Sequence, residues 1–370
     1  NTTGTQNVAV GTYALDANTT GSNLTAVGYA ALTASTTGER LTALGTGALT
    51  ANTTANDNTA IGYESLNSNT TGERNTAIGD SALNQNTTAA SNIAVGHEAL
   101  KSNTTGDANI AVGAYSLDQN TTGYYNTGCG HYSLGANTTG LFNIAVGYNA
   151  LATNTTGSGN VTIGTYANDA GNVAGTVAIG YAALTSNTGN SNVAVGDSAL
   201  YYNTSGTNNI AMGTSALQST TTGITNTGIG SGAGFAVTTG SNNSLLGHGA
   251  GRSSAPSGNV TTGSNIVCLG DNNVTDLYCA DTSISSSDSR DKTDVADFTH
   301  GLSWINQLNP ITYRWDKRTW YDDNTPDGSK KRNKKHIGFL AQDVLAIEGN
   351  PTDKDDMLVV NLNEDDTAYG

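Results

Sequence analysis

Asn75-Thr76-Ala77-Ile78-Gly79 is one copy of a five-residue phrase that returns along most of this sequence. The next copy, Asn92-Ile93-Ala94-Val95-Gly96, lies 17 residues later, and the same step recurs between Gly11 and Gly247, with two steps of 16. A fixed short period is typical of solenoids, in which each repeat forms one coil and contacts only its neighbours. The sequence therefore predicts an all-β fold, a parallel β-solenoid (β-roll) of about 16 coils stacked about 4.8 Å apart.

The alternation within the phrase predicts a short β-strand, because larger side chains stand two residues apart with Ala between them. We assign the aliphatic residue before the glycine to the core and expect the glycine to form a corner, since glycine adopts positive φ at little cost. A Leu four residues after the glycine is expected to be the second inward residue. The predicted core ladder is Ile61, Ile78, Val95, Val112 and Val146, the corners include Gly62, Gly79 and Gly96, and the second wall is Leu66, Leu83, Leu100, Leu117 and Leu151.

The Ala of each phrase is assigned to the face opposite this core. A thin stack would leave that face as a flat strip of methyl groups in water, so we expect it to pack against copies of itself. A parallel homotrimer is the predicted assembly. The expected contacts between chains are Ala60, Ala77, Ala94 and Ala111.

The composition agrees with a thin, repetitive body. The chain has 370 residues, of which 46 are Gly and only 12% are charged, which does not suit a thick globular core. Its net charge of −15 disfavours nucleic acid as a partner, and no apolar run is long enough to insert into a membrane. Cys129, Cys268 and Cys279 lack metal-ligand spacing, and Cys129 is expected to be a small buried core residue. No metal or cofactor is predicted.

The repeat is interrupted in two places. Residues 165–175 place Asn168 where Leu is expected, which predicts a bulged loop, and after Gly247 the next phrase is delayed by 23 residues. We therefore divide the chain into a repeat shaft over 1–251, an irregular end and linker over 252–284, and a second, small α+β domain over 285–370. That last part contains all three Trp residues and 11 of the 15 Lys and Arg residues.

Three ordered motifs occur in the C-terminal part: Ser287-Asp288-Ser289-Arg290-Asp291-Lys292, Asn309-Pro310-Ile311-Thr312-Tyr313-Arg314-Trp315, and His336-Ile337-Gly338-Phe339-Leu340-Ala341-Gln342-Asp343-Val344. Together they resemble the intramolecular chaperone auto-processing domain of endosialidase-type phage tailspikes and fibres. The long C-terminal helices of that family have no counterpart before Gly370 and are expected to be missing. The repeat phrase is similar to the head repeats of trimeric autotransporter adhesins and phage tail fibres, which are left-handed β-rolls.

The resemblance implies that three chaperone domains nucleate a trimer, and that the domain then releases itself by cutting between Ser286 and Ser287. A serine nucleophile needs a base, and a partly desolvated lysine can serve as one. The implied catalytic residues are Ser287 as nucleophile and Lys292 as base, with Asp288 either orienting the pair or holding the strained peptide, and Arg290 pairing with a carboxylate of the domain. Such a domain is at most a single-turnover serine endopeptidase, and the shaft is not expected to be an enzyme.

The predicted function is that of a structural phage tail fibre, an extracellular part of the virion that attaches to a host receptor, either a glycan or an outer-surface protein. One alternative is a bacterial trimeric adhesin head at the cell surface, which predicts a membrane anchor after residue 370. A second alternative is a tailspike that degrades polysaccharide. The solenoid carboxylates show no recurrent pair of the kind that glycoside hydrolysis requires.

Overall fold

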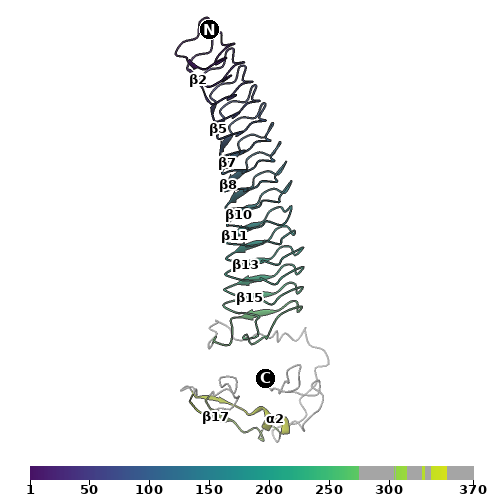
Figure 1. Ribbon diagram of the computed structural model, residues 1–370. Coiled ribbons are helices and arrows are strands. Elements are labelled where there is room, and N and C mark those ends of the chain that lie inside the picture. Colours follow the sequence, from purple (N-terminus) through teal and green to yellow (C-terminus); the bar gives the residue numbers. More distant parts are fainter. Residues whose placement is uncertain (275–303, 305, 315–326, 330–334, 348–370) are drawn as a thin grey trace. The chain divides into compact units, whose positions relative to one another are not determined.

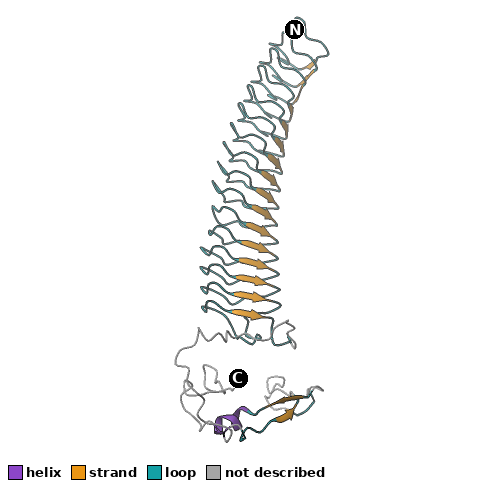
Figure 2. Ribbon diagram, turned by 180° about the vertical axis from the view of Figure 1, so that it is seen from behind, coloured by secondary structure: helices purple, strands orange, loops and turns teal. Residues whose placement is uncertain are grey.

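The computed structural model describes residues 1–274, 304, 306–314, 327–329 and 335–347. The chain divides into two compact units, Asn1–Tyr278 and Cys279–Gly370. The first unit is a stack of coils, each contributing one short strand to the same side, and it forms an elongated, gently bent body (Figures 1 and 2).

Sixteen parallel strands form one sheet, in which each strand pairs with the next one in the sequence. The register puts equivalent positions of neighbouring repeats side by side, as Ile78 does with Val95. This architecture confirms the predicted parallel β-solenoid. The strands are β1 (Val8–Val10), β2 (Leu24–Val27), β3 (Leu41–Leu44), β4 (Thr59–Ile61), β5 (Thr76–Ile78), β6 (Ile93–Val95), β7 (Ile110–Val112), β8 (Thr127–Cys129), β9 (Ile144–Val146), β10 (Val161–Ile163), β11 (Val177–Ile179), β12 (Val193–Val195), β13 (Ile210–Met212), β14 (Thr227–Ile229), β15 (Ser244–Leu246) and β16 (Val267–Leu269).

The two faces of the sheet are the reverse of the prediction. The strand Ala residues point into the solenoid and are completely buried, whereas the residues on either side of them point out. The expected chain contacts Ala60, Ala77, Ala94 and Ala111 are therefore interior residues of a single chain. The predicted core ladder of Ile61, Ile78, Val95, Val112 and Val146 lies on the outer face, where each side chain is half-buried or exposed. The second wall was correct: Leu66, Leu83, Leu100, Leu117 and Leu151 are fully buried.

The interior is too narrow for two large side chains to face each other, which explains the reversal. Where the strand position holds Leu245 instead of Ala, the Leu positions of its own and the preceding coil hold Gly251 and Gly234. A Cβ on Gly234 would lie 2.7 Å from the Leu245 side chain. One large residue faces one small residue in both arrangements, so the available volume decides which residues point inward.

Columns of buried Asn residues complete the interior. Asn69 donates from Nδ2 to Oδ1 of Asn52 at 3.2 Å and to the carbonyl of Gly72 at 2.9 Å, and the same pattern continues from coil to coil. A second column uses Oδ1 of Asn75, which accepts the backbone N–H of Asn92 at 2.9 Å. These bonds satisfy polar groups that would otherwise be buried without partners. The recurrent Asn-Thr-Thr-Gly segment is thus structural.

The corner after each strand requires glycine. Gly79 has φ of 141°, and a Cβ there would lie 2.6 Å from the carbonyl carbon of Gly96 in the next coil. Both the left-handed backbone and the close approach of the coils exclude larger residues. The predicted corners at Gly62, Gly79 and Gly96 are confirmed, since all three have positive φ.

The irregular repeats keep the sheet in register. The coil of residues 165–175 is one residue shorter than most rather than bulged outward, and Val161 still pairs with Val177. Asn168 occupies the Leu place and accepts a hydrogen bond from Asn187, which links it to the Asn column. After Gly247 the additional residues form turns, and β16 then pairs with β15. The described part of the second unit contains an antiparallel pair, β17 (Ile311–Tyr313) with β18 (His336–Gly338), and the helix α2 (Ala341–Ile347).

Candidate functional site

The predicted self-cleavage residues Ser287, Asp288, Arg290 and Lys292 lie outside the described residues, as does the bond between Ser286 and Ser287. Their roles therefore remain predictions from the sequence motif. The strand and helix motifs further along are described: Ile311–Tyr313 forms β17, and the Gly-Phe-Leu-Ala-Gln phrase leads from β18 into α2.

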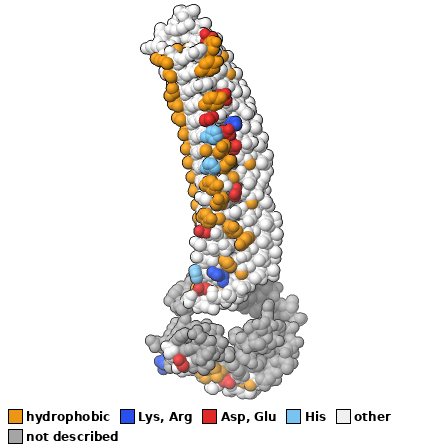
Figure 3. Space-filling model, viewed as in Figure 1, with side chains coloured by type: hydrophobic (Ala, Val, Ile, Leu, Met, Phe, Trp, Pro, Cys, Tyr) orange, Lys and Arg blue, Asp and Glu red, His pale blue; other side chains and the backbone are white. Residues whose placement is uncertain are grey.

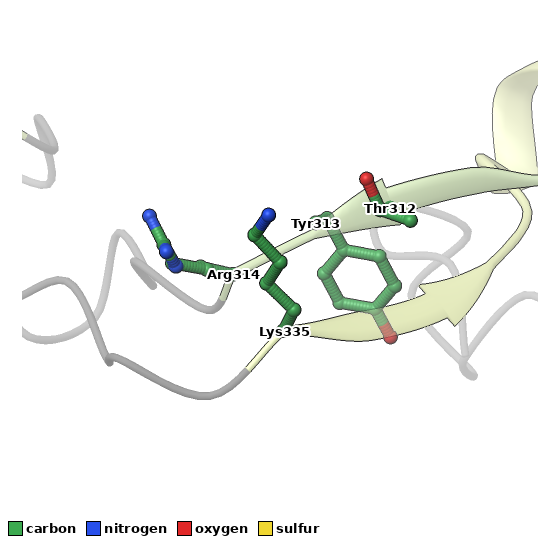
Figure 4. A pocket seen from close by; sticks show the side chains of 4 residues that line it. All are labelled: Thr312, Tyr313, Arg314 and Lys335. Atoms are coloured by element: carbon green, nitrogen blue, oxygen red, sulfur yellow. The ribbon is translucent and has the colours of Figure 1, made fainter.

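The β17–β18 hairpin carries two cationic side chains beside each other. Arg314 follows β17 and Lys335 precedes β18, and both side chains extend to the same side of the hairpin (Figure 4). Together with Thr312 and Tyr313 they line a depression of about 250 Å³. The pairing of Tyr313 with His336 holds the two strand ends together.

The outer face of the 16-stranded sheet is a continuous candidate surface for binding another chain or a partner. Each strand presents two outward side chains, and most of them are aliphatic. On β7 these are Ile110 and Val112, which are 39% and 38% exposed. Because the strands are in register, the side chains form two columns along the sheet, and Figure 3 shows lines of hydrophobic side chains that follow the length of the solenoid.

Cys129 belongs to the second of these columns and is exposed, not buried as predicted. It pairs with Val112 on one side and Val146 on the other. Cys129 stands where most repeats have an aliphatic residue, and its side chain points outward as theirs do. Among the described strands, β8 thus places an exposed thiol on the outer face.

Sequence reasoning also missed a row of aromatic side chains that leave the solenoid just after the corner glycines. His97, His131 and His248 each directly follow a corner glycine. The ring of His131 stacks on that of Tyr148, the equivalent residue of the next coil, with centroids 5.6 Å apart. The signal that would have identified the row is the recurrence of Tyr or His at the first or second position after the glycine.

Among the described residues, no three His, Cys, Asp or Glu side chains come close enough together to hold a metal ion. No described helix is long and apolar enough to cross a bilayer.

Comparison with known families identifies the C-terminal segment. Residues 287–352 match the family model described as chaperone of endosialidase. No curated protein matches the sequence. The matched segment begins at Ser287, the residue that opens the first of the three motifs, and includes β17, β18 and α2. A parallel β-solenoid followed by an endosialidase-type chaperone domain fits a tail-fibre-like protein.

Proposed function

We propose that this chain is the shaft of a homotrimeric phage tail fibre, which its C-terminal domain assembles and then releases by cutting before Ser287. The match of residues 287–352 to the chaperone of endosialidase supports a role in assembly. The solenoid supports a role as an extended shaft, because each coil adds one strand and one rise. Attachment to a host surface is the function that such a shaft serves.

The exposed aliphatic side chains on the outer face of the sheet are the main support for the trimer proposal. Soluble monomers rarely expose a continuous apolar patch larger than several hundred Å², and larger patches mark interaction surfaces. Here the aliphatic side chains of Ile93, Ile110 and Ile144, on β6, β7 and β9 of one chain, are about 40% exposed. Three copies that turn this face toward a common axis bury both columns at once. The contact surface is then the Ile and Val columns and not the Ala positions.

The proposed order of events follows from the local nature of solenoid contacts. A coil gains stability only from its neighbours, so three chains need a common starting point to align their coils. The chaperone domain supplies it by bringing three C-termini together. Once the fibre has formed, Lys292 takes the proton of the Ser287 hydroxyl, whose Oγ attacks the carbonyl carbon of Ser286. The Ser286–Ser287 peptide bond breaks, the freed Ser287 amine takes up the proton, and the two segments are then joined by an ester through Oγ. Water hydrolyses this ester, which leaves a carboxylate at Ser286, restores the Ser287 hydroxyl and releases the chaperone segment.

Mass measurement and crosslinking through Cys129 test the trimer. Light scattering of the purified chain should give three times the chain mass. A short bis-maleimide should convert the chain into covalent dimers through Cys129, because the proposal places the three copies of this thiol around one axis. In a Cys279→Ser background, Cys129→Ser should abolish the crosslink, and adding Thr105→Cys, an exposed residue of a return loop, should not restore it. A monomeric mass would reject the assembly.

Intact mass after expression tests the cleavage separately. The wild-type chain should yield a fragment that begins at Ser287. Ser287→Ala and Lys292→Ala should each give an uncut trimer, since assembly does not use the hydroxyl or the amine. Continued cleavage at the same bond in Ser287→Ala would reject the proposed nucleophile, and an uncut wild type would reject self-processing in this chain.

A further inference from the structure

A continuous band of aromatic rings runs over six consecutive coils. Tyr115 stacks on Tyr132 with centroids 4.8 Å apart, and Tyr148 meets Tyr166 edge to face at 5.3 Å. We define the aromatic band as His97, Tyr115, His131, Tyr132, Tyr148, Tyr166 and Tyr181, in which each ring lies within 6.4 Å of another.

The fold does not require this band. In the coils after Tyr181 the same two positions hold small or polar residues, such as Thr214 with Ser215, and β12 to β14 remain in register. The second position is also left-handed, with φ of 56° at both Tyr132 and Tyr166, where a bulky residue is less favourable than the glycine found at Gly232.

The rings remain accessible in the chain. Tyr132, Tyr148 and Tyr181 are 40%, 43% and 56% exposed. Figure 3 shows hydrophobic and histidine side chains alternating with acidic ones along one line of the solenoid. A neighbouring ring covers one face of Tyr132 and one face of Tyr148, and the ring surface that stays exposed can pack against a ligand with apolar faces of its own.

Polar groups meet the rings in a shallow depression of about 360 Å³ near the middle of the band. Tyr132, Tyr148, Asn149, Thr153 and Asp169 line it, together with Ala152. Burial raises the pKa of Asp169 to about 6, and the hydrogen bond with the Ala152 backbone lowers it only in part. Aromatic faces beside a carboxylate, an amide and hydroxyl groups suit a pyranose, whose C–H face stacks on a ring while its hydroxyl groups form hydrogen bonds.

The charges around the band select against anionic ligands. Lys101 is the cation beside it, and its Nζ is already bound to Glu98 at 2.7 Å. Asp118 and Asp169 are half-buried carboxyl groups on the same coils. Nucleic acids and acidic polysaccharides need unpaired cationic side chains, so a neutral chain is favoured.

We propose that the aromatic band binds a neutral polysaccharide that lies along the solenoid, with one sugar seated between Tyr132, Tyr148 and Asp169. Coils are about 4.8 Å apart. This spacing is similar to that of successive sugars in an extended polysaccharide, so successive sugars can lie beside the rings of successive coils. Several weak contacts along one chain add to a useful affinity. The inference rests on the proposed function and names the class of receptor that the fibre recognises.

Affinity electrophoresis of the full-length chain tests the proposal. Native gels containing a soluble β-glucan, a galactomannan or dextran serve as neutral probes, and a gel containing alginate serves as the anionic probe. Retardation is expected in at least one neutral gel and not in alginate. Tyr148→Ala should weaken the binding about tenfold, and Asp169→Ala should also weaken it. Tyr63→Ala is the matched control, because Tyr63 is an exposed tyrosine at the same repeat position as Tyr148 but outside the band, and it should bind as wild type does.

Each other outcome overturns the proposal. No retardation in any neutral gel, retardation in alginate alone, or equal loss in Tyr63→Ala would reject the band as a neutral glycan site. A change of the light-scattering mass in Tyr148→Ala would identify the band as a contact between chains or with another protein. The proposed assembly is judged by mass and crosslinking without polysaccharide, so a trimer that does not bind rejects this inference alone.

Discussion

The two faces of each short strand of the solenoid differ in the size and in the exposure of their side chains. Ala94 is completely buried, while its chain neighbour Ile93 is 40% exposed. Across the repeats the inner position is almost always small and changes to Leu245 only where Gly251 makes room, whereas the outer positions accept Thr, Ile, Val, Met, Ser and Cys. In a coil so narrow, the size of the space decides which face points in, and hydrophobicity alone does not.

The largest expected effect belongs to the outer face. Val95→Lys combined with Val112→Lys should leave each coil folded, because both side chains point out of the chain, but should prevent the trimer from forming. An unpaired charge at a closed interface costs several kcal/mol, and three copies would meet there. Circular dichroism should retain the wild-type spectrum while light scattering reports a monomer. A stable trimer in this variant would show that the outer face is not the contact surface.

Substitution on the inner face tests the volume argument directly. Ala94→Leu should lower the free energy of unfolding by about 1–3 kcal/mol per chain, because the site has no room for three more carbons. Val95→Leu adds one carbon to the next residue and should have little effect on the fold of the coil. Adding Leu100→Ala to Ala94→Leu should recover part of the loss, as the natural combination of Leu245 and Gly251 does. Equal tolerance of both single changes would contradict the assigned faces.

A gap in the interior polar ladder offers a smaller, stabilising change. Thr220 replaces Asn, and both its hydroxyl and Oδ1 of Asn203 lack hydrogen-bond partners within the described residues. Thr220→Asn should continue the column and raise the free energy of unfolding by about 0.5–1.5 kcal/mol, as one recovered buried hydrogen bond does. Thermal unfolding measures it, and Thr221→Asn in the same segment is the control. A lower melting temperature in Thr220→Asn would mean that this coil has no room for the amide.

The smallest expected effect concerns a carboxyl group on the outside of the coils. The pKa of Asp169 is raised to about 6 from its ordinary value of 3.8, so the folded chain binds this proton more tightly than the unfolded chain does. The contribution of the protonated Asp169 to the free energy of unfolding therefore falls as the pH rises from about 4 to about 6. Asp169→Asn should melt slightly higher than wild type at pH 7 and equally at pH 4, by a small margin because solvent screens a half-exposed group. A difference that persists unchanged at pH 4 would assign it to packing.

The repeat period, the strand positions, the glycine corners and the Leu wall follow from the sequence, because a periodic pattern fixes equivalent positions whatever their environment. The inward direction of the strand does not follow from the general preference of aliphatic residues for the core. One repeat indicates this direction: Leu replaces Ala at strand position 245 where Gly replaces Leu at position 251, as expected if the two positions face each other in the interior. The chaperone segment was predicted from its three motifs, since those residues are specific to a family. The aromatic band was missed because its rings alternate between two repeat positions and only neighbouring coils bring them together.

The hydrogen bonds of the sheet and of the Asn columns join each coil only to the coils next to it. The number of coils can therefore change without altering the contacts of the others. Removing residues 63–79 takes out one complete period, so Gly62 would lead into Asp80 and the strand at Thr59–Ile61 would pair with Ile93–Val95. The Asn column would close in the same way, with Asn86 donating to Asn52. Unequal recombination between the repeated gene segments can therefore shorten or extend the reach of the molecule in whole steps, without new contacts having to evolve at the junction.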